Sequence, residues 1–124
     1  MAKLLTGVRI VVVEDHHDSR EIVATMLQFY GAAVTPVSTA GEAVSVVANA
    51  DADIVVTDFS MPGEDGAWLL ERVNEQPRPV PVVVLSGFAE SHVPRLADAP
   101  FARKLLKPID PEDLSRVILQ VLQG

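Results

Sequence analysis

The run VRIVVVED at residues 8–15 indicates the fold of this chain, because an almost unbroken stretch of β-branched residues leads directly into two acids. Such a continuous apolar run is typical of a parallel strand that helices cover on both faces. Comparable runs recur along the chain, and the second contains Pro36, which lacks a backbone N–H and therefore indicates an edge strand. We expect five strands, at residues 8–13, 33–37, 53–57, 81–85 and 102–106.

Amphipathic segments lie between these runs, and the alternation predicts an α/β fold built from βαβ units around a parallel sheet. We expect helices at residues 18–30, 39–49, 66–74, 88–98 and from residue 110 onward. Thr39 and Glu42 match a capping box, and Asp110 before Pro111 is typical of a helix start. Pro94 interrupts the fourth of these segments.

Composition indicates one domain spanning residues 1–124, since a chain of this length with 48% hydrophobic residues can bury a core without disulfides. The formal net charge of −7 opposes binding to a nucleic-acid phosphate backbone, so we expect no direct nucleic-acid partner. The apolar N-terminal run is broken by Thr6, Gly7 and Arg9 and is too short to insert into a membrane. The absence of cysteine fits the cytoplasm, which is the expected location.

Polar residues close four of the five apolar runs. Glu14 and Asp15 follow the first run, Asp58 the third, Ser86 the fourth and Lys107 the fifth. Parallel strands end at one edge of their sheet, and ligands bind in the crevice outside that edge. We therefore expect three carboxylates, a hydroxyl and an ammonium group to converge there, which is the set that a phosphoryl-transfer site needs.

The chemistry of Mg²⁺ explains the acidic part of this set, because the ion prefers oxygen ligands and is usually held by one or two carboxylates. Asp15 and Asp58 are predicted to bind it directly and Glu14 through a water molecule; Mn²⁺ is the alternative ion. An aspartate can also attack phosphorus, while the metal neutralises the developing charge. Lys107 and Ser86 then provide a positive charge and a hydrogen bond for phosphoryl oxygens.

The segments VVVEDHHDSR (11–20), VVTDFSMPGEDG (55–66), VVVLSG (82–87) and LLKP (105–108) resemble the receiver domain of response regulators over essentially the whole chain. The resemblance implies a flavodoxin-like, doubly wound, five-stranded parallel sheet of order 2-1-3-4-5 with five helices. It implies that Asp58 is phosphorylated and that the backbone carbonyl of Ser60 joins Glu14 and Asp15 around Mg²⁺.

The same resemblance implies further roles. Ser86 and Lys107 match the residues that sense the phosphoryl group, and the Lys107-Pro108 bond matches one that is cis in the family. Ser60 and Phe88 occupy positions that tune how fast the acyl phosphate hydrolyses. A purely structural explanation of the loop after Asp58 is compatible with these roles: Pro62-Gly63 would form a turn and Gly66 would adopt a positive φ angle.

One position departs from the family pattern. Receivers usually carry Tyr or Phe three residues before the conserved lysine, where this chain has Lys104. In the family that ring links the phosphorylated site to the surface around the fifth strand, and Phe101 is not an obvious substitute for it. We therefore expect a different readout, through the loop after Asp58 or the irregular segment containing Pro94.

The resemblance implies a histidine kinase or histidine phosphotransfer protein as donor and a downstream output protein or domain. The chain would catalyse only its own phosphorylation and dephosphorylation, so it is not expected to be a conventional enzyme. Both a stand-alone regulator and a part of a hybrid kinase or longer regulator fit the sequence.

Two other functions are the alternatives. One is a degenerate receiver that binds proteins without phosphate, and the other is a haloacid dehalogenase-type phosphatase, which would need a second Asp where Ser60 stands. A nucleotide-binding domain is disfavoured, because no P-loop occurs.

Overall fold

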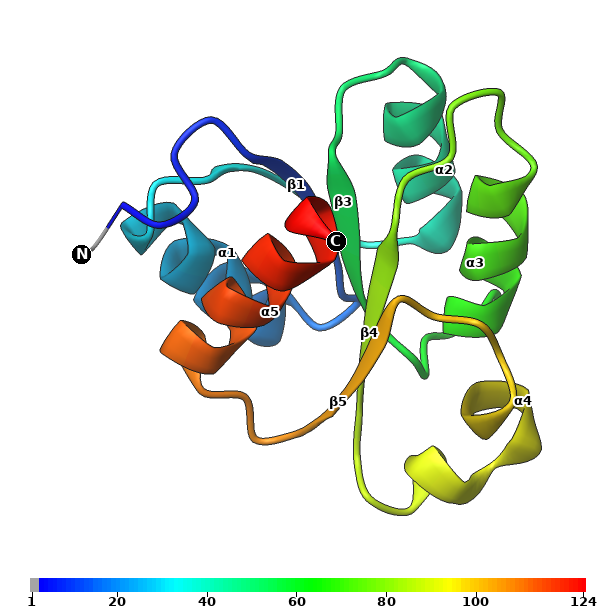
Figure 1. Ribbon diagram of the computed structural model, residues 1–124. Helices are drawn as coiled ribbons and strands as arrows, with labels where there is room; N and C mark the ends of the chain where they lie inside the picture. Colours follow the sequence, from blue (N-terminus) through cyan, green and yellow to red (C-terminus); the bar gives the residue numbers. More distant parts are fainter. Residues whose placement is uncertain (1–2) are drawn as a thin grey trace.

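The computed structural model describes residues 3–124 and contains a five-stranded, fully parallel sheet with helices on both faces (Figure 1). The strands lie in the order β2-β1-β3-β4-β5, which confirms the predicted topology and the edge position of the strand that contains Pro36. Their bounds are β1 Arg9–Val13, β2 Ala33–Val37, β3 Ile54–Asp58, β4 Val82–Ser86 and β5 Arg103–Leu106.

Two strands differ from the predicted bounds in a way that concerns the site. β3 and β4 each end one residue later than expected, so Asp58 and Ser86 are the last residues of their strands. Asp58 pairs with Leu85 and Ser86 pairs with Leu106, because the ladder continues through these polar residues. The backbone of both residues is therefore held by the sheet.

The helices divide between the two faces of the sheet (Figure 1). α1 (His17–Phe29) and α5 (Pro111–Gln123) lie on one face, whereas α2 (Ala40–Ala48), α3 (Gly66–Asn74) and α4 (Pro94–Ala97) lie on the other. Each face encloses its own apolar cluster. Val11, Val55 and Val84 point toward the α2 and α3 side, while Val12, Val56 and Val83 point toward α1 and α5. Side chains alternate between the faces of a strand, which explains why these runs are apolar without interruption.

Local signals set most helix boundaries. Thr39 and Glu42 form the predicted capping box, and the Asp110 side chain accepts the Asp113 N–H at 3.0 Å. α1 begins at His17, one residue earlier than expected. No helix within residues 3–124 has the length and apolarity needed to cross a membrane.

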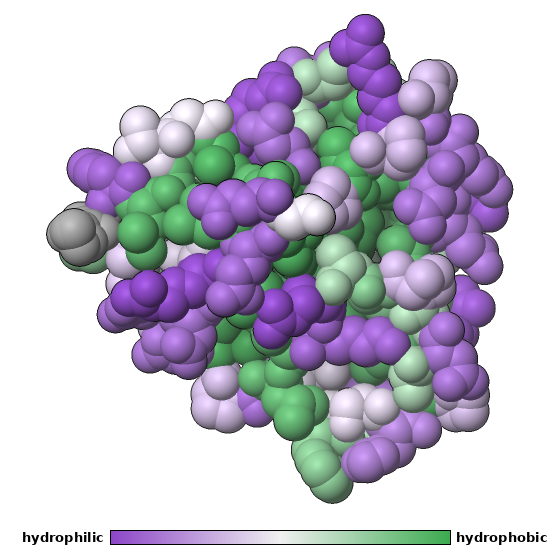
Figure 2. All heavy atoms as spheres, in the orientation of Figure 1, coloured by the Kyte–Doolittle hydropathy of each residue, from purple (hydrophilic) through white to green (hydrophobic). Residues whose placement is uncertain are grey.

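The expected helix over residues 88–98 is wrong as a continuous element. The structure has a short 3₁₀ helix, η1 (Glu90–His92), followed by the four-residue α4. Val93 between them is extended, with φ −73° and ψ 127°, because a residue before proline avoids the helical region. Phe88, Val93 and Leu106 are exposed, and Figure 2 shows apolar surface at the lower edge of the molecule, where Figure 1 places this connection.

The loop after β3 also differs from expectation at Gly66. Gly63 has the positive φ angle, 81°, whereas Gly66 lies in α3. Gly66 is needed for another reason: a Cβ atom there would lie 3.2 Å from the Phe59 Cα atom and 3.3 Å from the Asp58 carbonyl oxygen. The start of α3 therefore packs directly against the backbone that carries Asp58.

Candidate functional site

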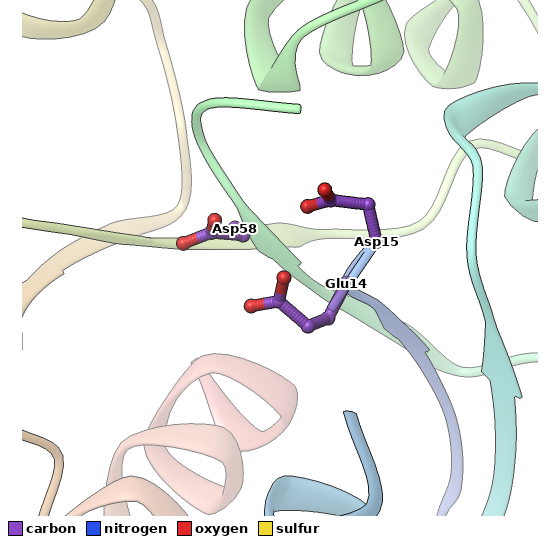
Figure 3. A group of neighbouring side chains, drawn as sticks. All are labelled: Glu14, Asp15 and Asp58. Carbon is purple, nitrogen blue, oxygen red and sulfur yellow. The ribbon is translucent and has the colours of Figure 1, made fainter. Parts of the chain in front are cut away.

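Three carboxylates converge at the carboxyl edge of the sheet, as predicted. Val13 of β1 pairs with Thr57 of β3, so the residues that follow them lie side by side. One carboxylate oxygen each from Glu14, Asp15 and Asp58 lies within 4.8 Å of the others. Figure 3 shows the three side chains extending from the ends of β1 and β3 toward a common space.

These acids differ in burial. Glu14 and Asp58 are buried, at 8% and 9% exposure, while Asp15 is exposed. Burial raises the pKa of Asp58; the Lys107 ammonium opposes this, and the negative charges of Glu90 and Asp15 add to it, leaving the pKa raised. Burial also raises the pKa of Glu14, and its hydrogen bond from the His16 N–H only partly offsets the effect. Ionised acids are therefore costly here unless a cation joins them.

Lys107 provides one such cation. It follows β5, its backbone N–H donates to the Ser86 carbonyl oxygen at 2.8 Å, and its ammonium group forms an ion pair with Asp58 Oδ1. Burial lowers the pKa of Lys107, but the hydrogen bond and charge of Asp58 outweigh it, so the pKa is raised. Among residues 3–124, no other hydrogen-bond donor reaches Asp58 Oδ1. The Lys107-Pro108 bond is cis, as the resemblance implied.

Ser86 lies beside the acids on the neighbouring strand. It is 2% exposed at the end of β4, and the Phe59 N–H donates to the carbonyl oxygen of the residue before it, Leu85, at 3.0 Å. The strand ends that carry Asp58 and Ser86 are therefore joined at the site. The structure thus brings together Glu14, Asp15, Asp58, Ser86 and Lys107, which sequence analysis placed at separate strand ends.

The remaining predicted positions lie around this group. Ser60 is exposed, and Phe88 is 70% exposed with its ring edge-on to His92 at a centroid distance of 4.7 Å. Lys104 is exposed on β5, where its ammonium group donates to the Ala97 carbonyl oxygen. Phe101 is buried in the cluster under α2 and α3. The aromatic position is therefore filled by a cation that holds the end of α4.

Two residues at the site were missed by sequence analysis. Arg20 of α1 donates to the Glu14 carbonyl oxygen at 2.9 Å and so holds the backbone of the acidic pair. Glu90 of η1 accepts the Gly87 N–H at 2.9 Å and also the Ser60 hydroxyl. Glu90 is a single acid in a segment without regular periodicity, so no pattern marked it. Its position depends on contact between two loops that lie 30 residues apart.

The donor set fits a hard divalent cation. Carboxylate oxygens are the ligands that Mg²⁺ and Mn²⁺ prefer, and three of them meet here with two of their carboxyl groups buried. Asp58 has one buried oxygen whose partner is a cation, Lys107. The exposed Asp15 lies on the solvent side, where an ion would enter with its remaining waters.

Comparison with known proteins agrees with this geometry. A profile of the response regulator receiver domain matches residues 10–119. A 14.6 kDa protein of Leptolyngbya boryana is 34% identical over 119 residues, which are 94% of this chain and 91% of that protein. The two-component response regulator ORR6 of Oryza sativa subsp. japonica is 30% identical over 118 residues, 90% of this chain and 69% of that protein.

A solved structure is similar over nearly the whole fold. It is the receiver domain of the sensor histidine kinase PA1611 from Pseudomonas aeruginosa PAO1, with a TM-score of 0.87 and 24% identity, covering 96% of this chain and 100% of that one. That structure has a magnesium ion coordinated in its active site cleft. At this level of identity the likeness concerns the fold.

Proposed function

Because this chain belongs to the response regulator receiver domain family, we propose that Asp58 takes a phosphoryl group from a phosphohistidine in a reaction that requires Mg²⁺. The observation that carries the proposal is the convergence of Glu14, Asp15 and Asp58 with the Lys107 ammonium group on Asp58. The donor is a histidine kinase or a histidine phosphotransfer protein, and the reaction takes place in the cytoplasm.

In the transfer step an Asp58 carboxylate oxygen attacks the phosphorus atom. The new P–O bond forms as the P–N bond of phosphohistidine breaks, and the electron pair of that bond returns to the imidazole nitrogen. Lys107 moves its contact from the carboxylate to a phosphoryl oxygen, and the Ser86 hydroxyl donates to another. Lys107 already contacts Asp58, and Ser86 is buried at the end of the neighbouring strand.

The residues that would hold the metal are Asp15, Asp58, the Ser60 backbone carbonyl and, through water, Glu14. When bound, Mg²⁺ neutralises charge on the phosphoryl oxygens and offsets the repulsion among the acids. Mn²⁺ suits the same oxygen ligands. The magnesium ion in the active site cleft of the PA1611 receiver supports a magnesium site in this fold.

The product of the reaction is the phosphorylated chain itself, so the protein acts as a signal carrier rather than as an enzyme with many turnovers. Phosphorylation replaces the Asp58 carboxylate, which carries one negative charge, with an acyl phosphate whose phosphoryl oxygens carry about −2. The net gain of about one negative charge lies beside Lys107, and the resulting conformational change is read by an output protein or domain. The competing function is a degenerate receiver that binds partners without phosphate. Lys104 at the aromatic position favours it, and the intact acidic site opposes it.

Intact-mass spectrometry after treatment with acetyl phosphate and Mg²⁺ separates the two. We expect the wild-type chain to gain the mass of one phosphoryl group, and Asp58→Asn or chelation by EDTA to abolish the gain. Asp51→Asn removes an exposed acid outside the site and should behave like the wild type. An unmodified wild-type chain, or a phosphoryl group retained by Asp58→Asn, would contradict the proposal.

A further inference from the structure

Glu90 occupies hydrogen-bond donors that lie next to the proposed phosphoryl acceptor. Its two carboxylate oxygens accept different donors, Gly87 N–H at 2.9 Å and the Ser60 hydroxyl. Ser60 lies two residues after Asp58, and Gly87 directly follows Ser86. One carboxylate therefore bridges the loops after β3 and β4 at the mouth of the site.

The Gly87 N–H and the Ser60 hydroxyl are hydrogen-bond donors of the kind that bind phosphoryl oxygens. A phosphoryl group has three acceptor oxygens and a charge of about −2, and it is stabilised by fixed N–H and O–H donors. The negative charge of Glu90 acts on both Asp58 and Lys107, which places the carboxylate within electrostatic reach of both partners in the transfer. A second anion at this position would compete with Glu90 for the same donors and would be repelled by it.

Resting on the proposed function, we infer that Glu90 is an internal anion that occupies the phosphoryl-binding donors of the unphosphorylated chain and leaves them when Asp58 is phosphorylated. The inference concerns the regulation of the same site. Glu90 lowers the affinity of the site for the phosphoryl group, and η1 moves when a bound phosphoryl group displaces Glu90.

The structure limits how far this movement extends. On the far side of η1, Arg95 forms a two-point ion pair with Asp65, Nε to Oδ2 at 2.6 Å and an Nη atom to Oδ1 at 3.0 Å. Val93 is extended between η1 and α4, so the two short helices are not one rigid rod. Displacement of Glu90 would therefore move residues 88–92 while Arg95 keeps α4 in place.

The test is a titration with beryllofluoride, a noncovalent mimic of the phosphoryl group, in the presence of Mg²⁺. Amide NMR spectra of the full chain report both affinity and the environment of Gly87 and η1. In the wild type, we expect the amides of Gly87 and residues 88–92 to shift on binding while Arg95 changes little. Glu90→Gln removes the charge but keeps an acceptor, and we expect it to bind beryllofluoride about fivefold more tightly.

Matched variants separate this effect from a general change in charge. Glu75→Gln removes one negative charge at the end of α3 and should leave the affinity unchanged. Glu90→Ala removes both hydrogen bonds as well as the charge, and should also bind more tightly and shift the Gly87 amide before any ligand is added.

The possible failures are distinguishable. Equal or weaker binding by both Glu90 variants, with a wild type that does bind, would overturn the inference and leave the proposed function standing. A wild-type chain that binds no beryllofluoride under any Mg²⁺ concentration would overturn the proposed function itself.

Discussion

At the scale of single residues, the fold holds three acids and only one lysine together at the site, so negative charge is in excess there. Glu14 and Asp58 are held nearly without solvent contact, Asp15 stands exposed beside them, and Lys107 neutralises only one of the three. Clustered acids are retained at functional sites although they reduce stability, because the same repulsion favours binding of a cation. The proposed cation site therefore explains these residue types, which packing alone does not.

This imbalance predicts the behaviour of Asp15→Asn. The substitution removes one negative charge near Glu14 and Asp58 and breaks no ion pair within residues 3–124, so we expect the free energy of unfolding in metal-free buffer to rise by about 0.5 kcal/mol. Added Mg²⁺ should raise the melting temperature of the wild type and have little effect on the variant. Thermal unfolding with and without Mg²⁺ measures both. An equal Mg²⁺ response in the two proteins would argue against Asp15 as a ligand.

A second residue pair, outside the site, predicts a dependence on pH. Arg9 forms an ion pair with Asp53 at 3.0 Å, and its hydrogen bond lowers the pKa of Asp53 despite partial burial. A carboxyl whose pKa is lower in the folded state stabilises the fold above its unfolded pKa, and this contribution is lost as pH falls through the folded pKa. The stability advantage of the wild type over Asp53→Asn should therefore be largest at neutral pH and shrink in acid.

Urea unfolding of both proteins at several pH values below 7 measures this difference. Asp98→Asn, which removes the charge of an exposed acid at the end of α4, is the matched control for the loss of one surface charge. A difference between wild type and Asp53→Asn that stays constant down to the lowest pH would show that the Arg9 pair contributes nothing through the charge of Asp53.

At the scale of elements, the sequence predicted features that depend on contacts between residues close in sequence, and it missed features that depend on contacts between distant segments. The buried strands were predictable because a strand covered on both faces must be apolar at nearly every position, as in residues 54–57 and 82–85. Two helix starts depend on contacts within four residues, made by Thr39, Glu42 and Asp110. Such local patterns can be recognised in the sequence. The break at Val93 follows from the rule for residues before proline, although the expected helix ran through it.

The parts that were missed depend on contacts between distant loops. Glu90 reaches Ser60 across two elements, and Arg20 reaches back to the Glu14 carbonyl from α1. Gly66 was assigned a positive φ angle because a turn was expected, whereas its small size is required by the approach of α3 to β3. These constraints become visible only once the elements are packed together.

Gly66 leads to a prediction for the junction of β3 and α3. In Gly66→Ala, the new methyl group would press on backbone atoms of Phe59 and Asp58, which cannot rotate away, so we expect a loss of about 1–3 kcal/mol in the free energy of unfolding. This outweighs the gain in helix propensity. Gly41→Ala in α2 is a matched control, because a Cβ atom there meets nothing within 4 Å among residues 3–124, and it should be neutral or more stable by up to about 1 kcal/mol.

Urea unfolding compares the two glycine variants directly, and Gly66→Ala should also shift the amide signals around Asp58. A Gly66→Ala protein that is as stable as Gly41→Ala would mean that α3 can move away from β3 without cost. The close contact would then have no bearing on the position of Asp58.

At the scale of the whole molecule, the central strands of the sheet, which carry the site, are more deeply buried than the edge strands. Every residue of β3 and β4 is buried, whereas most residues of the edge strands β2 and β5 are not. Amide hydrogen exchange should therefore be slowest in β1, β3 and β4 and faster in β2 and β5. Exchange measured residue by residue checks this order, and protection of β5 equal to that of β3 would contradict it.

The carboxylate of Asp65 ties two helices to one point. It accepts the Trp68 N–H at 2.9 Å and so starts α3, and the same group holds Arg95 at the beginning of α4. A movement of Arg95 would act directly on the carboxylate that caps α3, and Gly66 in the first turn of α3 packs against the backbone of Asp58 and Phe59. A partner that binds over α3 and α4 would therefore contact two helices that are linked through one carboxylate. A shift of either helix would act on Asp65, close in sequence to the end of β3.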